Sequence, residues 1–185
     1  MTKTKQTWLV VGIVLLALVL DQWSKIYIKT HFELGEAREV FSWFWIVFVE
    51  NNGMAFGIEW FSKLLLTLFR IVAVGVIGWY IHTLIHKQTV RTGYLATVAM
   101  VIAGALGNII DCVCYGKIWG YADWFHGKVV DMLYFPLIRN AAGEVLFFRP
   151  VFNIADSFIT VAVLLIIIFY RKDLDASLAG VGERF

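Results

Sequence analysis

Four long apolar segments limit what this sequence can fold into. They cover residues 8–28, 64–85, 94–115 and 151–170, and none contains more than two charged residues. About 20 apolar residues in a helix, rising roughly 1.5 Å each, cross the hydrocarbon core of a bilayer. The chain is 60% hydrophobic and 16% charged, whereas a soluble domain is about 25% charged. The sequence therefore predicts an all-α membrane protein, a bundle of four transmembrane helices, and excludes a soluble enzyme.

The first segment has a second interpretation, as a cleaved signal peptide, because Lys3 and Lys5 precede its apolar run. A cleavage site needs small residues after that run. After Leu20 the chain continues instead with Asp-Gln-Trp-Ser-Lys at 21–25. We therefore expect the segment to remain as the first span.

The positions of Lys and Arg predict the orientation of the spans. Four spans place both termini on one side, and the basic residues of the short tails and of the turn at 86–93 lie next to span ends. The positive-inside rule then places both termini in the cytoplasm. We expect a single membrane domain over residues 1–172 and a loose, polar C-terminal tail over 173–185.

The two outer-face loops, 29–63 and 116–150, contain short segments with strand composition. Residues 40–49 and 145–148 are rich in aromatic and β-branched side chains and are too short to span a bilayer as helices. The sequence predicts a small β-rich interfacial subdomain on the outer face of the bundle.

Three acids lie within the apolar segments, at Asp21, Asp111 and Asp156, and a fourth, Asp131, lies in a short apolar stretch of the second outer loop. With cytoplasmic termini, all four fall in the outer half of the bilayer. A carboxylate inside a membrane is costly, so each is a candidate functional residue.

Two of these acids follow an asparagine at the same spacing. Asn108 precedes Asp111 by three residues, and Asn153 precedes Asp156 by three. On a helix this spacing places both side chains on one face. We expect each amide to bond a carboxylate and hold its rotamer.

Each acid also has a structural interpretation. Asp21 and Lys25, four residues apart, form a natural ion pair near a helix end, and we favour that role over direct chemistry. The third-span Asn and Asp can join helices through polar contacts. Asp131 can be a solvated loop acid, and Asp156 can cap a helix start.

Glycines add a third signal. Gly104 and Gly107 place small residues three apart in the third span, which lets another helix approach closely. A turn-rich loop containing Asn51, Asn52 and Gly53 precedes the second span, with adjacent amide side chains near the membrane.

Five sequence blocks combine these features, at 21–25, 51–57, 104–111, 129–131 and 152–156. In composition and order they resemble the motif blocks of bacterial lipoprotein signal peptidase, signal peptidase II. The resemblance implies that Asp131 and Asp156 form the catalytic pair. It also implies that the other motif residues support the site and the substrate: Asp21, Lys25, Asn51, Gly53, Gly107, Asn108, Asp111, Asn153 and Ala155.

The resemblance further implies an aspartyl endopeptidase of the bacterial inner membrane that removes the signal peptide of a diacylglyceryl prolipoprotein, cutting just before the lipid-modified Cys. Two close carboxylates sharing one proton would activate water. We expect an active site toward the outer face, contact with membrane lipid, and a monomer. No metal or cofactor is expected, because no intramembrane His accompanies the acids. No nucleic acid is expected, because basic residues are not clustered.

The sequence departs from the family pattern in two places. Cys112 follows Asp111 where the family usually has Arg. If that Arg pairs with a carboxylate, either another cation, with Arg70 as a candidate, must substitute for it, or the Asp must stay neutral. The outer loops at 115–128 and 137–149 are longer than the compact family pattern and could shape a lid.

Two other classes of membrane protein compete with the peptidase. A proton-coupled carrier also uses intramembrane carboxylates, but it normally has repeated halves and a site at the membrane midplane. A membrane scaffold needs no acids within its spans.

Overall fold

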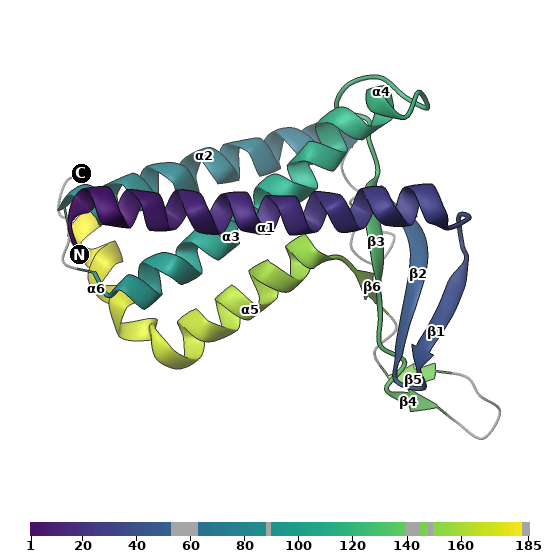
Figure 1. Ribbon diagram of the computed structural model, residues 1–185. Coiled ribbons are helices and arrows are strands. Elements are labelled where there is room, and N and C mark those ends of the chain that lie inside the picture. Colours follow the sequence, from purple (N-terminus) through teal and green to yellow (C-terminus); the bar gives the residue numbers. More distant parts are fainter. Residues whose placement is uncertain (53–62, 88–89, 140–144, 148–149, 183–185) are drawn as a thin grey trace. The chain divides into compact units, whose positions relative to one another are not determined.

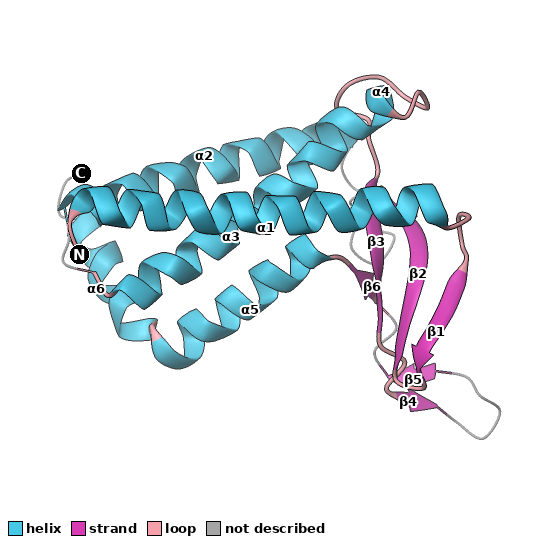
Figure 2. Ribbon diagram, viewed as in Figure 1, coloured by secondary structure: helices cyan, strands magenta, loops and turns pink. Residues whose placement is uncertain are grey.

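The computed structural model describes residues 1–52, 63–87, 90–139, 145–147 and 150–182 (Figures 1 and 2). The chain divides into two compact units. The first unit contains residues 1–19, 68–107 and 155–185, and the second contains residues 20–67 and 108–154.

The first unit is helical. It takes most of its residues from α1 (Lys3–His31), α2 (Lys63–Lys87), α3 (Thr92–Ile110), α5 (Ile154–Phe169) and α6 (Arg171–Gly182). Its apolar core joins one side of α2 to one side of α3, through Ile81, Leu84, Ile85, Tyr94, Leu95 and Val98.

A close approach of α3 to α5 depends on Gly104. A Cβ atom at this position would overlap the carbonyl oxygen of Ala155 and the side chain of Ile159. Because backbone cannot give way as a flexible side chain can, only glycine fits here. The role predicted for the small residues of the third span is confirmed at Gly104.

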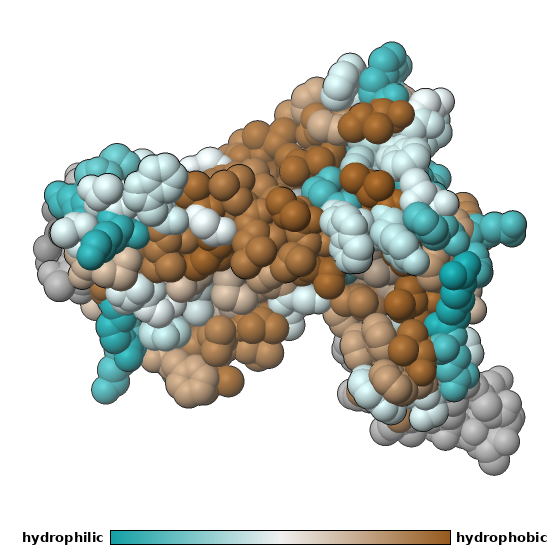
Figure 3. Space-filling model, in the orientation of Figure 1, coloured by the Kyte–Doolittle hydropathy of each residue, from teal (hydrophilic) through white to brown (hydrophobic). Residues whose placement is uncertain are grey.

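Large apolar side chains remain exposed along the helices of this unit, among them Phe69 and Val72 of α2 and Ile167 and Ile168 of α5. Figure 3 shows hydrophobic residues gathered along the helices. Such a surface suits lipid rather than water. Within the described part of the chain, three helices are long and apolar enough to cross a membrane: Lys3–His31, Leu64–His86 and Thr92–Ile118. The bent pair of α5 and α6 passes as a fourth only if it is one span.

The C-terminal tail that we predicted to be loose is helical as far as it is described. Helix α6 is bent by 87° from α5. Arg91 bridges the two helices, since its Nε donates to Asp173 Oδ1 at 2.9 Å and its Nη2 to the Phe169 carbonyl at 2.9 Å. The prediction was wrong because polar composition shows no sign of a tertiary contact from residues 82 positions away.

The second unit is built on an antiparallel sheet with strand order β1-β2-β3-β6. The strands are β1 (Ala37–Phe41), β2 (Phe44–Asn51), β3 (Val129–Tyr134) and β6 (Val151–Phe152). A separate pair joins β4 (Ile138–Arg139) to β5 (Val145–Phe147). The β-rich subdomain predicted from strand composition is confirmed.

Two boundaries differ from the predicted ones. Residues 151–152, assigned to the fourth span, form β6 and pair with Leu133 and Tyr134, so the helix begins at Ile154. Asp131, assigned to a loop, lies in the central strand β3. In both places a short apolar run is compatible with a strand, a helix or a loop. Pairing with a strand that is distant in sequence makes each of them a strand.

The third span continues as a π-helical segment, Asp111–Tyr115, and ends in α4 (Gly116–Ile118). The following loop folds back onto it: the amide of Phe125 donates to the Val113 carbonyl at 3.0 Å, and that of Gly127 to Cys112 at 2.9 Å. A Cβ atom on Gly127 would overlap the Asp111 carbonyl oxygen. The long loop at 115–128 therefore packs against the helix end, which argues against an open lid. In the other long loop, 137–149, residues 140–144 and 148–149 lie outside the described part.

Candidate active site

Asp131 is buried in the middle of the sheet, with 2% of its surface exposed. The Asn51 Nδ2 group donates to Asp131 Oδ2 at 3.0 Å, and Asn153 Nδ2 donates to Asp131 Oδ1 at 2.7 Å. Asn51 ends β2 and Asn153 directly precedes α5, so two elements hold the carboxylate from two directions. A buried acid needs such partners, and the solvated-loop interpretation of Asp131 is wrong.

A chain of hydrogen bonds connects Asp131 to a buried lysine. Asn153 Nδ2 also donates to Asn108 Oδ1 at 3.1 Å, and Lys25 Nζ donates to the same Asn108 oxygen at 3.0 Å. The two asparagines thus bond to residues far away in sequence. Their spacing to Asp111 and Asp156 did not predict these partners.

Lys25 is fully buried between two acids. Its Nζ lies 2.9 Å from Asp21 Oδ2 and 2.8 Å from Asp111 Oδ2. The predicted Asp21–Lys25 pair is confirmed, and Asp111 is a second partner that the spacing did not reveal. Because Lys25 supplies a cation to Asp111, Cys112 in place of Arg leaves no uncompensated charge on this acid. The role suggested for Arg70 stays a prediction.

Two further residues support Asp111. Gln22 Nε2 donates to Asp111 Oδ1 at 2.9 Å and to Asp21 Oδ2 at 3.1 Å, and the Tyr115 hydroxyl donates to Gln22 Oε1 at 3.1 Å. We had not assigned a role to Gln22 or Tyr115. The only local signal for Gln22 was its place beside Asp21 in the first sequence block, and Tyr115 had none.

Asp156 lies in the first turn of α5 and is half-buried. Ala155 beside it is buried, and its carbonyl oxygen faces Gly104. Gly107 is buried in α3. The predicted site residue Gly53 lies outside the described residues.

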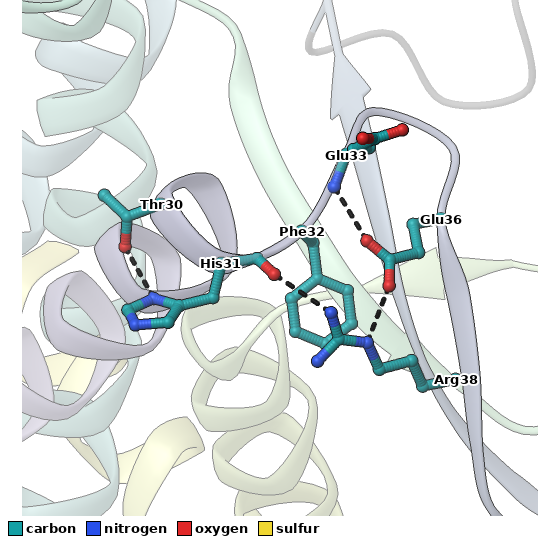
Figure 4. A pocket seen from close by; sticks show the side chains of 6 residues that line it. All are labelled: Thr30, His31, Phe32, Glu33, Glu36 and Arg38. Carbon is teal, nitrogen blue, oxygen red and sulfur yellow. Dashed lines mark hydrogen bonds and ion pairs between the residues drawn. The ribbon is translucent and has the colours of Figure 1, made fainter.

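Among the described residues, no three His, Cys, Asp or Glu side chains are grouped as ligands for a metal ion. A cavity of about 610 Å³ lies elsewhere in the second unit, at the end of α1. Its polar groups bond to one another, as when Arg38 binds Glu36 at 2.6 Å and the His31 carbonyl at 3.0 Å (Figure 4). No residue of the predicted site lines this cavity.

Comparison with known proteins identifies a family that this chain resembles over most of its length. Residues 13–171 match the family model described as signal peptidase (SPase) II. A lipoprotein signal peptidase of Porphyromonas gingivalis (strain ATCC 33277) is 41% identical over 97% of this chain and 90% of its own length. One from Amoebophilus asiaticus is 35% identical over 92% of this chain and 81% of its own.

A solved structure also matches. A bacterial membrane enzyme determined by the in meso method superposes with a TM-score of 0.68 and 29% identity, covering 89% of this chain and 88% of that one. The family model and the relatives together cover nearly all of the sequence and include every block that suggested the resemblance. The chain therefore belongs to the signal peptidase II family, the aspartic-type lipoprotein signal peptidases of bacterial membranes.

Proposed function

We propose that this chain is an intramembrane aspartyl endopeptidase in which Asp131 and Asp156 activate the water that cleaves the substrate. The substrate is a prolipoprotein whose Cys already carries a diacylglyceryl group, and the cut falls immediately before that Cys. The observation that carries the proposal is the buried Asp131 carboxylate, whose two oxygens accept bonds from Asn51 and Asn153.

The reaction needs the two acids in different protonation states. One ionised carboxylate takes a proton from water, while the protonated partner donates to the scissile carbonyl oxygen and stabilises the charge that develops there. Because the two acids share one proton, their titration belongs to the pair. In this scheme Asn51 and Asn153 orient Asp131 so that only its productive rotamer is occupied.

The remaining site residues support the pair. Lys25, between Asp21 and Asp111, balances buried charge and holds Asn108, which in turn binds Asn153. The orientation that goes with this function has both termini in the cytoplasm and the acids toward the outer face of the inner membrane. There the acyl chains of the substrate remain in lipid while the peptide reaches the acids. A monomer suffices for this scheme, since all the proposed groups come from one chain.

Cleavage of a diacylglyceryl prolipoprotein by the purified protein in detergent tests the proposal. Asp131→Asn and Asp156→Asn should each lose more than about 99% of kcat, because neither variant can share the proton. Asp123→Asn is the matched control, since this acid is exposed and its Oδ1 lies 3.9 Å from Lys117 Nζ. Substantial turnover by either active-site variant contradicts the catalytic pair, and inhibition by EDTA that a divalent ion reverses contradicts the metal-free reaction.

A further inference from the structure

A second charged cluster lies in the same unit and has no part in the reaction proposed above. Glu50 of β2 accepts bonds from two lysines: Lys29 of α1, through Oε1, and Lys128, which directly precedes β3, through Oε2 at 3.0 Å. The Lys29 and Glu50 side chains are only 10% and 11% exposed, and Lys128 is 36% exposed. This Lys29–Glu50–Lys128 cluster therefore joins α1, β2 and the segment before β3, and two of its three side chains are largely removed from water.

Three aromatic rings lie around the Lys29 ammonium group of this cluster. Lys29 Nζ lies 5.5, 5.3 and 5.1 Å from the ring centroids of Phe48, Trp119 and Tyr121, within the range of cation–π attraction. Burial raises the pKa of Glu50, but the bonds from Lys29 and Lys128 outweigh it and hold this pKa below its usual value. The carboxylate is thus charged at neutral pH and bound on two sides.

The sheet register relates this cluster to Asp131. Glu50 is paired with Val130, and Asn51 with Val129. Since side chains alternate between faces, Glu50 and Lys128 are diagonal neighbours on one face of the β2–β3 ladder. Asn51 and Asp131 are diagonal neighbours on the other face, where their bond measures 3.0 Å.

One register therefore forms both pairs, and a shift by one residue would break both. Asn51 is the last residue of β2, where a strand is least restrained. Glu50, the residue before it, is attached to the helix and to the start of β3 by its two lysines.

We infer that Glu50 is a positioning residue for the peptidase reaction: with Lys29 and Lys128 it fixes the end of β2, so that Asn51 keeps its bond to Asp131. The inference rests on the proposed role of Asp131. Glu50 itself contacts no reacting atom in this scheme. Glu50 affects the reaction through Asn51. This dependence on Asn51 distinguishes Glu50 from a residue that only stabilises the fold.

A double-mutant cycle on the purified full-length protein tests this route. Glu50→Gln keeps the shape of the side chain and removes its charge, and it should lower kcat about 10- to 100-fold with KM changed less than about twofold, as expected when a catalytic group is misplaced. Asn51→Ala should lower kcat at least as much. The double variant should be no slower than Asn51→Ala alone, because both changes act on one contact. Glu50→Asp, which keeps the charge, should recover part of the loss.

Glu36→Gln is the matched control, because it breaks an exposed ion pair with Arg38 next to the same sheet. It should leave kcat unchanged. If the kcat of Glu50→Gln equals that of the control while Asp131→Asn is inactive, the inference is overturned and the proposed function stands. Independent, multiplying losses from Glu50→Gln and Asn51→Ala also overturn it.

Two further variants keep the inference falsifiable. If Asp131→Asn retains turnover, the proposed function fails first, and the inference fails with it. If Glu50→Gln does not fold, Lys128→Met leaves the Lys29–Glu50 pair in place. It must then lower kcat in the folded protein, and an unchanged kcat overturns the inference.

Discussion

The two units of this protein differ in what they expose and what they bury. The first leaves large apolar side chains such as Phe69 and Ile168 at its surface and packs helix against helix, with Gly104 giving close approach. The second buries charged groups, Asp21, Lys25 and Asp111, which bond to one another or to amides. Lipid is the solvent that tolerates the first surface, whereas the second unit must satisfy each of these buried charges internally. The stability of the first unit therefore depends on how closely its helices pack, and that of the second on a bonding partner for each buried charge.

Removing the shared cation should cause the largest loss of stability. Lys25→Met leaves Asp21 and Asp111 buried without their cation, at a cost of about 3–5 kcal/mol in unfolding free energy. Asp21→Asn should cost less, because Lys25 keeps Asp111 as its partner at 2.8 Å. Chemical denaturation in detergent measures both.

The bond between Lys25 and Asp111 also sets the outcome of a double change. Replacing Asp21 and Lys25 together by Leu removes one ion pair but leaves Asp111 buried without its cation, so stability should not return to the wild-type value. Lys117→Met, at an exposed lysine, is the control and should stay within about 0.5 kcal/mol of wild type. If Asp21→Asn is as damaging as Lys25→Met, the pairing described here is not what stabilises this unit.

A change of shape should have an intermediate effect in the first unit. Gly104→Ala adds a Cβ atom that overlaps the Ala155 carbonyl, so a helix must move, at a cost of about 1–3 kcal/mol. Gly75→Ala in α2 meets nothing within 4 Å and should be neutral or stabilising. Equal melting temperatures for the two variants would show that close helix approach matters little here.

The smallest effect on the free energy of unfolding should come from protonation of Glu50 at low pH. Its pKa is below the usual 4.5 because the two lysine bonds outweigh burial, so these ion pairs contribute fully above about pH 4.5 and are lost as the pH falls through the folded value. The charged groups that bond to Glu50 are Lys29 and Lys128. The difference in unfolding free energy between wild type and Glu50→Gln should shrink below about pH 4.5. A difference that stays constant down to pH 3 would contradict this assignment.

Local features of the chain identified the spans and singled out the acids. Apolar length predicted α1, α2 and α3, and the cost of charge in a membrane drew attention to Asp21, Asp111 and Asp156. The four-residue spacing of Asp21 and Lys25 predicted their ion pair, since helix geometry alone brings such neighbours together. In each case the relevant property, either burial in lipid or an ion pair within one helix, follows from one continuous stretch of sequence.

Contacts between distant segments were decided by tertiary structure. Asp131 became a buried strand residue because β2 and β6 flank β3. Lys25 forms an ion pair with Asp111, 86 positions away in sequence, and Asn153 donates a hydrogen bond to Asp131, 22 positions away. Helix α6 is present where polar composition suggested a loose tail, and Arg91 bonds to Asp173 in its first turn. Strand register and helix packing set these partners, and both depend on energies summed over many residues rather than on any local spacing.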